Sequence, residues 1–271
     1  MLLIHRLESL DLPELAPYRS MRLQRDHQQQ GIFVAEGEKV TRRLLESPVE
    51  VISLVLPDKW LPELGALAQN RPETITAYVA PKDVLETLTG FPMYQGVLGL
   101  GRIPAPVPLD AVLKSSPRPR LFAAVDGLTS AENLGIVVRN CAALGVQAFL
   151  VGETSSHPYI RRAVRNSMGT VFNLPVVEPP SLAAALAELR RAGVRCIAAH
   201  PHTDKRRLSE ADFTGDCCVV FGSEGQGISE AVLSACSEGV SIPMRDGVDS
   251  LNVASATAAF LYEVRRQRGE A

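Results

Sequence analysis

The chain lacks several features that would assign it to a protein class at once. Its five cysteines are odd in number and show no CxxC spacing, so they indicate neither a disulfide framework nor a zinc site. No apolar run is long enough to span a bilayer, and the N-terminal segment reaches Arg6 and Glu8 too early to hold a signal-peptide core. There is no repeat of fixed period and no low-complexity tract. These absences predict a soluble cytoplasmic protein that holds no metal. The cysteines are expected to act as small buried hydrophobic residues: Cys141, Cys196, Cys217, Cys218 and Cys236.

An excess of positive charge is also missing. The formal net charge is -2, from 28 basic and 30 acidic side chains. Binding nucleic acid through bulk electrostatics needs clustered cations, so any RNA contact must be local. Two arginine clusters at helical spacing could supply such contacts, although each could equally be a solvated helix face. They are Arg19, Arg22 and Arg25, and Arg161, Arg162 and Arg165.

The 271 residues, of which 46% are hydrophobic, allow two domains. Residues 104–120 form the clearest seam, because they hold five of the nineteen prolines and no sustained hydrophobic period. We therefore place a substrate-binding domain at 1–105, a proline-rich linker at 106–120 and a second domain at 121–271.

Hydrophobic patterning predicts an α/β fold for both domains. In the first, the expected helices lie near 18–30, 38–47 and 61–69, with strands at 51–56 and 75–80. After the linker, short apolar strand candidates alternate with helical patterns down to a C-terminal helix beginning at LNVASATAAF. Such alternation predicts a parallel sheet covered by helices on both faces.

Ligands in open α/β sheets collect at the carboxyl ends of the strands, which draws attention to three loops. The first loop, DGLTSAEN, leads into a helix that Asn133 is placed to cap. Arg139 follows within that helix, where its neighbours are mostly apolar. A cation there needs a partner or an opening, unless it is an ordinary surface arginine.

The second loop, FGSEGQGIS, places Gly222, Gly225 and Gly227 between a strand and a helix, where backbone amides can approach a ligand closely. Its GxxGxG spacing differs from the GxGxxG of NAD-binding proteins, and the acidic residue expected about twenty positions later is missing. Glu224 could accept hydrogen bonds from a hydroxyl or a backbone amide. The alternative is a glycine-rich turn with a solvated glutamate.

The third loop, IPMRDGVDSLNV, enters a helix rich in small residues. Ser250 is suited to cap this helix, and Asn252 offers a donor and acceptors one turn inside it. Elsewhere, the HxH spacing of His200 and His202 could suit a metal, but the polar sequence PHTDKRR favours a surface loop.

The three loops together resemble the motifs of the SpoU (TrmH-like) family of RNA methyltransferases, within the SPOUT superfamily. The segments that carry the resemblance are NLGIVVR at 133–139, GSEGQG at 222–227 and IPMRDGVDSLNVASA at 242–256. Departures are small: Ser223 stands where many relatives have Asn, and residues 130–132 replace an approach that more often contains proline. The segment GIFVAEGEKVTRRLLES similarly looks like the start of the family's substrate-binding domain, a small fold akin to certain ribosomal proteins.

The resemblance implies a trefoil-knotted C-terminal domain that binds S-adenosylmethionine, dimerises, and places Arg139 of one subunit near the partner's cofactor. The implied cofactor-binding residues are Gly222, Gly227, Ile242, Met244 and Leu251. The implied residues around the reacting hydroxyl are Asn133, Arg139, Glu224, Ser250 and Asn252. We expect RNA phosphates at Arg19, Arg22, Arg25, Arg161 and Arg165.

The implied reaction is methylation of a ribose 2′-hydroxyl in RNA, with ribosomal RNA preferred to tRNA because the accessory domain suits a folded rRNA element. Family proposals make the Arg139 equivalent the base, yet a guanidinium is effectively always protonated. We therefore expect Arg139 to bind the adjacent phosphate and stabilise alkoxide charge, while a phosphate oxygen or water takes the proton.

Three other functions remain open at this point. A base-methylating relative would share the cofactor pocket, and locating the methyl group after nuclease digestion would identify it. A non-catalytic RNA-binding or ribosome-assembly protein would not bind the cofactor. A nicotinamide dehydrogenase is disfavoured by the glycine spacing.

Overall fold

The computed structural model describes residues 1–93, 95–201 and 206–270 and divides the chain into two compact units. Unit 1 comprises Met1–Ala105 together with Pro158–Asn173, and unit 2 comprises Pro106–His157 and the chain from Leu174 onward. Residues 158–173, which the sequence pattern groups with the second domain, therefore pack with the first. Hydrophobic periodicity does not reveal such an excursion because it reports only which face of an element is buried.

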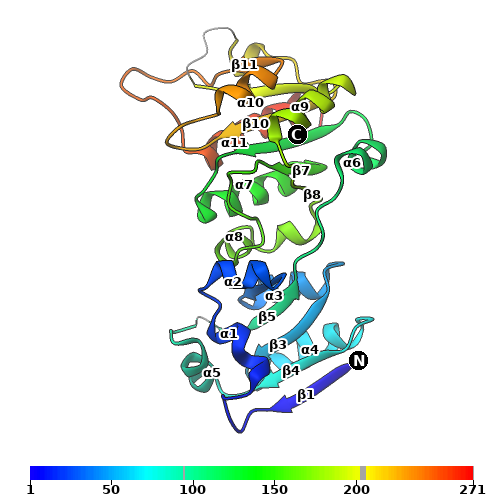
Figure 1. Cartoon of the computed structure of the whole chain (residues 1–271), viewed down its shortest axis with the longest axis vertical. Coiled ribbons are helices and arrows are strands. Elements are labelled where there is room, and N and C mark those ends of the chain that lie inside the picture. The colour runs from blue at the N-terminus through cyan, green and yellow to red at the C-terminus, as the bar shows by residue number, and fades with distance from the viewer. Residues whose placement is uncertain (94, 202–205, 271) are drawn as a thin grey trace. The chain divides into compact units, whose positions relative to one another are not determined.

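Unit 1 contains a mixed five-stranded sheet in the order β1-β4-β3-β5-β2 (Figure 1). Strands β1, β4 and β3 are parallel, and β5 runs antiparallel to both of its neighbours. Only β3 and β4 were predicted. In β5, Gly101 allows the close approach of Phe33, whose ring would lie 2.6 Å from an added Cβ. The strands are β1 (Leu2–Arg6), β2 (Ile32–Glu36), β3 (Val51–Leu56), β4 (Ile75–Val79) and β5 (Leu98–Arg102).

Helices cover both faces of the unit 1 sheet. Helices α3 (Glu38–Leu45) and α4 (Leu61–Gln69) lie over one face, and α1 (Ala16–Arg19) and α5 (Lys82–Thr89) over the other. The single helix expected over 18–30 is instead α1 followed by α2 (Gln24–Gln29). Helix α8 (Arg161–Asn166), from the excursion, packs against β2.

Unit 2 is built on a sheet of six parallel strands in the order β11-β9-β10-β6-β7-β8, which confirms the predicted parallel sheet. The central strands β6, β7 and β10 are apolar along almost their whole length, as expected for a sheet that is buried on both faces. The six strands are β6 (Leu121–Asp126), β7 (Ala148–Val151), β8 (Val176–Val177), β9 (Arg195–Ala199), β10 (Cys217–Gly222) and β11 (Glu238–Val240).

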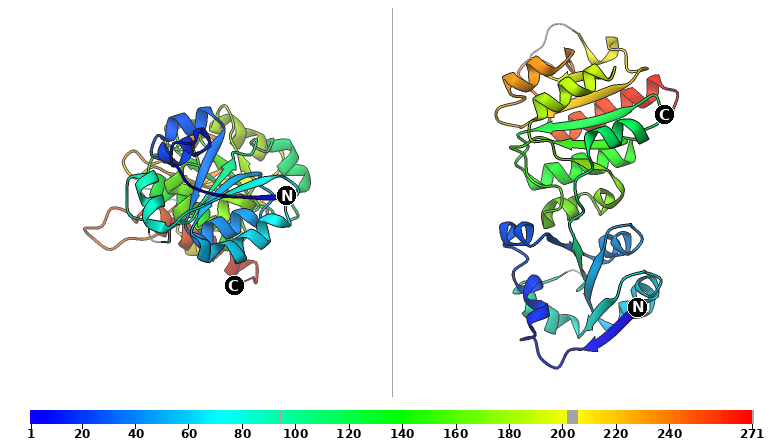
Figure 2. Two further views of the ribbon diagram at one scale, coloured as in Figure 1. Left: turned by 90° about the horizontal axis from the view of Figure 1, so that it is seen from below. Right: turned by 45° about the vertical axis from the view of Figure 1, so that its right-hand side comes forward.

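Helices α9 (Leu182–Arg191) and α10 (Glu230–Ala235) cover one face of this sheet, and α7 (Ala131–Ala143) and α11 (Val253–Gln267) the other (Figures 1 and 2). The proline-rich linker also contains a helix, α6 (Leu109–Ser115), which the sequence analysis did not predict. Its Val112 is buried in the unit 2 core, so part of the linker is structural.

The cysteines behave largely as expected: four are buried, and Cys236 is partly buried. Burial raises the pKa of Cys217 to about 11 and that of Cys236 to about 12, so both thiols stay protonated at neutral pH. Among the described residues, no helix is both long enough and apolar enough to cross a membrane.

Candidate functional site

One polar side chain from each of the three loops meets at the carboxyl edge of the unit 2 sheet. The amide of Asn133 donates to Oε1 of Glu224, and the amide of Asn252 donates to the same oxygen over 2.8 Å. Asn252 also donates to Oδ1 of Asn133 at 3.2 Å. Strands β6 and β10 are parallel neighbours, so their loops leave the sheet side by side. The structure therefore joins three of the predicted catalytic residues in one hydrogen-bonded cluster.

Helix capping positions two members of this cluster and corrects two predictions. Helix α7 is capped by Ser130, whose Oγ accepts from the Asn133 backbone N–H at 3.3 Å, and not by Asn133. The Asn133 side chain is thereby left for Glu224. Helix α11 is capped by Asn252, whose Oδ1 accepts from Ala254 N at 2.9 Å, rather than by Ser250. Asn252 thus lies at the start of its helix, with its amide nitrogen directed to the cluster.

Glu224 is carried by a tight hairpin that only glycine permits. Backbone bonds of 3.0 Å in both directions join Ser223 and Gly227. A Cβ at Gly222 would lie 2.2 Å from the carbonyl carbon of Gly227, and Gly227 itself has a φ of +68°. The Ser223 hydroxyl also accepts from Gln226 N at 3.2 Å. The glycine pattern therefore builds the turn that presents Glu224.

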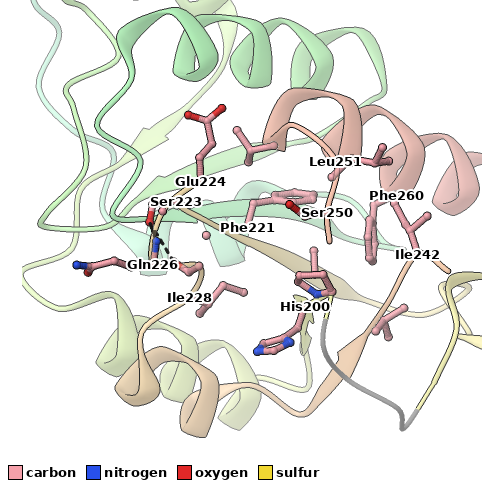
Figure 3. Close-up of a pocket in the computed structure, with 18 of the residues that line it drawn as sticks. His200, Phe221, Ser223, Glu224, Gln226, Ile228, Ile242, Ser250, Leu251 and Phe260 are labelled. Carbon is pink, nitrogen blue, oxygen red and sulfur yellow. Dashed lines mark hydrogen bonds between the residues drawn. The ribbon is translucent and has the colours of Figure 1, made fainter. Parts of the chain in front are cut away.

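Behind this hairpin is a cavity of about 250 Å³ (Figure 3). All five predicted cofactor-binding residues line it: Gly222, Gly227, Ile242, Met244 and Leu251. Ser250 and Glu224 line it as well, and Phe260 of α11 contributes an aromatic wall. The cavity thus combines apolar side chains with glycine backbone and few charged groups, which is the usual character of a small-molecule site.

The sequence analysis missed one wall of the cavity. Residues 199–201, which run from the last residue of β9 into the loop after it, line it, and Figure 3 shows His200 beside Ile228, across from Glu224. His200, which we expected in a polar surface loop, lies in a loop, is half-buried and faces the cavity. Strand pairing explains this placement: β9 pairs in parallel with β10 and β11, so its carboxyl end belongs to the same edge of the sheet. His202 lies outside the described residues.

Arg139 occupies an exposed position on α7. Within the part of the chain that the structure describes, its guanidinium makes no ion pair and no hydrogen bond, so all five donors remain available. The described residues also contain no group of three or more His, Cys, Asp or Glu side chains that could hold a metal ion. The site consists of the polar cluster, the adjoining cavity and a basic residue on α7.

The predicted RNA-binding arginines lie in unit 1 and differ in their surroundings. Arg22 and Arg161 both lie over the Phe91 ring, at 4.6 and 5.7 Å from its centroid, so one member of each cluster meets at one aromatic side chain. Arg161 and Arg165 also pair with Glu36. By contrast, Arg19 donates to the backbone carbonyls of Leu10 and Leu12, which gives it a structural role. Arg25 is exposed.

Comparisons with known proteins converge on one family. The sequence profile of the SpoU rRNA methylase family matches residues 120–262. An uncharacterised tRNA/rRNA methyltransferase of Mycobacterium tuberculosis is 34% identical over 87% of this chain and 81% of its own length. The 23S rRNA (guanosine-2′-O-)-methyltransferase RlmB of Acinetobacter baylyi is 32% identical over 78% of this chain and 86% of its own.

A solved structure also matches along nearly the whole chain. The SpoU methyltransferase AviRb from Streptomyces viridochromogenes, in complex with AdoMet, superposes with a TM-score of 0.81 at 28% identity. The match covers 96% of this chain and 100% of that one.

Proposed function

The chain belongs to the SpoU rRNA methylase family, and on that premise we propose that it transfers the methyl group of S-adenosylmethionine to a ribose 2′-hydroxyl of ribosomal RNA. The observation that carries the proposal is the Asn133–Glu224–Asn252 cluster beside the cavity behind the hairpin. Ribose and ribosomal RNA are favoured by the name of the RlmB relative, which specifies the guanosine 2′-oxygen of 23S rRNA.

The cavity fits a nucleoside cofactor. Ile242, Leu251 and Phe260 offer apolar surface to an adenine ring, and Gly222 and Gly227 offer backbone groups to polar substituents. Met244 extends the apolar wall. S-adenosylmethionine supplies a methyl group on a sulfonium centre, which is already electrophilic. The AdoMet complex of AviRb supports this assignment.

The protein's main catalytic task is then to align the ribose hydroxyl and help it to lose a proton. Two amides fix Oε1 of Glu224, while its Oε2 has no hydrogen bond within the described residues and can accept one from the ribose. Ser250, on the cavity wall, offers a further hydroxyl.

We assign Arg139 to the phosphate next to the target nucleotide. A guanidinium binds phosphate bidentately and stabilises the negative charge that develops on the attacking oxygen. The proton leaves to a phosphate oxygen or to water, because Arg139 is already protonated.

The family resemblance supports three further parts of the proposal. Residues 121–271 form a trefoil-knotted methyltransferase domain, two copies of which form a homodimer, with Arg139 reaching the partner's site. Unit 1 selects the RNA, using Arg22 and Arg25 of the segment 1–105 and Arg161 and Arg165 of the excursion as phosphate contacts. RNA is the natural substrate because only RNA carries the 2′-hydroxyl. The cytoplasmic location stays a prediction.

Transfer of labelled methyl from S-adenosylmethionine to unmodified RNA tests the proposal. Ribosomal RNA and tRNA are separated after the reaction, and the Arg139→Ala variant serves as the control. Label in the ribosomal pool that the variant fails to transfer supports the proposal. Label confined to tRNA changes the substrate class, and a methyl group found on a base after nuclease digestion overturns the ribose assignment.

A further inference from the structure

Unit 1 contains a second cavity, of about 320 Å³, and Arg165 alone among its lining residues enters the methyl-transfer proposal. Its volume is at the lower end of the range of about 300–1,000 Å³ for small-molecule sites. One wall runs from the end of β2 into α3, over residues 36–40. The others come from the segment before β5 and from Arg165 and Met168 of the excursion. We call it the Lys39 cavity.

The charges around the Lys39 cavity leave a positive excess. Glu36 is paired with two guanidinium groups, those of Arg161 and Arg165, which leaves one positive charge uncompensated. Arg42 pairs with both Glu38 and Glu63, each at 2.6 Å, so these three groups together carry one uncompensated negative charge. The paired carboxylates and guanidinium groups therefore balance, and Lys39, which is exposed and has no ion pair within the described residues, supplies a net positive charge of one. The rim of the Lys39 cavity is therefore expected to attract an anionic group.

Donors on the rim remain available for that anion. Arg165 uses one nitrogen for Glu36 at 2.9 Å, and its side chain is 58% exposed. Gln95 accepts from Glu38 N through Oε1 at 3.0 Å, which orients its amide so that its NH₂ group can donate. A phosphodiester oxygen accepts hydrogen bonds from all of these groups.

The interior of the cavity is apolar and held in place. Met93 and Val97 are buried, and Met168 of the excursion also lines the cavity. Met168 adopts a left-handed φ of 54°, and its carbonyl accepts from Arg43 at 2.6 Å, which fixes the excursion to α3. Flat apolar groups such as nucleobases suit a slot between thioether and aliphatic side chains.

From this combination we propose that the Lys39 cavity binds one splayed-out nucleotide of the substrate RNA, at a position other than the methylated one. Its phosphate lies against Lys39 and Arg165, and its base enters between Met93 and Met168. This proposal rests on RNA being the substrate. Such a site allows unit 1 to recognise an unpaired nucleotide in addition to the charge of the RNA backbone. Only a base that is neither paired nor stacked can turn out of its strand and enter a cavity.

Two variants that each lose one positive charge distinguish binding at this cavity from general electrostatic attraction of RNA to the protein. Lys39→Gln removes a cation from the cavity, and Lys59→Gln removes one from another exposed position in unit 1. Binding of a fluorescent 20-nucleotide single-stranded RNA of random sequence is measured by anisotropy between 50 and 300 mM KCl. We expect Lys39→Gln to weaken binding about three- to tenfold and to lower the salt slope by about 0.7, with Lys59→Gln close to wild type. Equal effects of the two variants overturn the proposal.

Photocrosslinking locates the base directly. The wild-type protein is irradiated with the same RNA containing 4-thiouridine, and the crosslinked peptides are identified by mass spectrometry. Crosslinks to the peptides that carry Met93, Val97 or Met168 support the proposal, and crosslinks confined to other peptides refute it. S-adenosylmethionine affinity and methyl transfer by wild-type protein are measured in parallel, so that failure of the methyltransferase assignment is recognised separately.

Discussion

The side-chain amide of Asn252 donates to Oε1 of Glu224 over 2.8 Å and joins the cap of α11 to the glycine hairpin. Asn252 therefore has two tasks, because its Oδ1 simultaneously holds the first turn of α11. The two roles of Asn252 can be separated experimentally, by comparing a substitution that removes only the contact with Glu224 with one that removes the helix cap as well.

Asn252→Ser keeps the helix cap, since Ser caps as well as Asn, but removes the amide that orients Glu224. We expect wild-type thermal stability and a large loss of methyl transfer. Asn252→Ala should lose transfer and also about 1 kcal/mol of stability. Thermal unfolding and kcat are measured for both variants. Full activity in the Ser variant would show that the amide contact is dispensable.

Arg139→Lys keeps the charge of Arg139 and removes its bidentate fork. Because we assign Arg139 to the substrate phosphate, kcat should fall about 100-fold while S-adenosylmethionine affinity stays nearly unchanged. Single-turnover kinetics and calorimetric cofactor binding give the two values. Near-normal turnover in this variant refutes the assigned role.

Gly222→Ala forces a Cβ to within 2.2 Å of the Gly227 carbonyl carbon, so the hairpin must open. We expect a cost of about 1–3 kcal/mol and weakened cofactor binding. Gly225→Ala is the matched control, because an added Cβ there meets nothing within 4 Å. Isothermal titration with S-adenosylmethionine compares the two, and equal affinities would contradict the steric argument.

The members of the first arginine cluster should have different roles: RNA binding for Arg22 and Arg25, and stability for Arg19. Arg22→Gln with Arg25→Gln should weaken RNA binding and flatten its salt dependence, with little change in melting temperature. Arg19→Gln should instead lower the melting temperature, because its guanidinium bonds to two backbone carbonyls. Anisotropy titrations and thermal unfolding are measured for each variant. Unchanged RNA binding at low salt in the double variant removes the RNA role.

His27 predicts a pH dependence of stability. Burial lowers its pKa in the folded state, and its Nε2 lies 3.2 Å from the Ser20 hydroxyl. The unfolded chain, with an ordinary pKa of about 6.5, therefore binds the proton first as the pH falls. Stability contributed by neutral His27 is complete above about pH 6.5 and is lost progressively below it.

The measurement for His27 is the free energy of unfolding of wild type and His27→Gln at pH 5 and pH 7. The variant should lose less stability between the two values than wild type does. Identical losses in the two proteins would assign the acid sensitivity to other groups.

Local patterns predicted much of the fold and most of the candidate site. Strands β3 and β4 and helix α4 were found because their apolar periods are regular and their ends are marked by turn residues. Strands β1 and β5 were missed: β1 is largely exposed, and β5 carries two glycines. The caps of α7 and α11 were each placed on the wrong neighbour, since several residues near each helix start can cap it.

The sequence by itself determined the family resemblance and the parallel sheet of unit 2, because these depend on local spacing and on alternation of elements, and the resemblance implied five of the residues that line the cavity. Only the tertiary structure decided that Asn133, Glu224 and Asn252 share hydrogen bonds, that His200 faces the cavity, and that residues 158–173 complete the Lys39 cavity. These contacts join residues far apart along the chain. Their formation depends on how whole elements pack together, which the order of residues within any one motif does not specify.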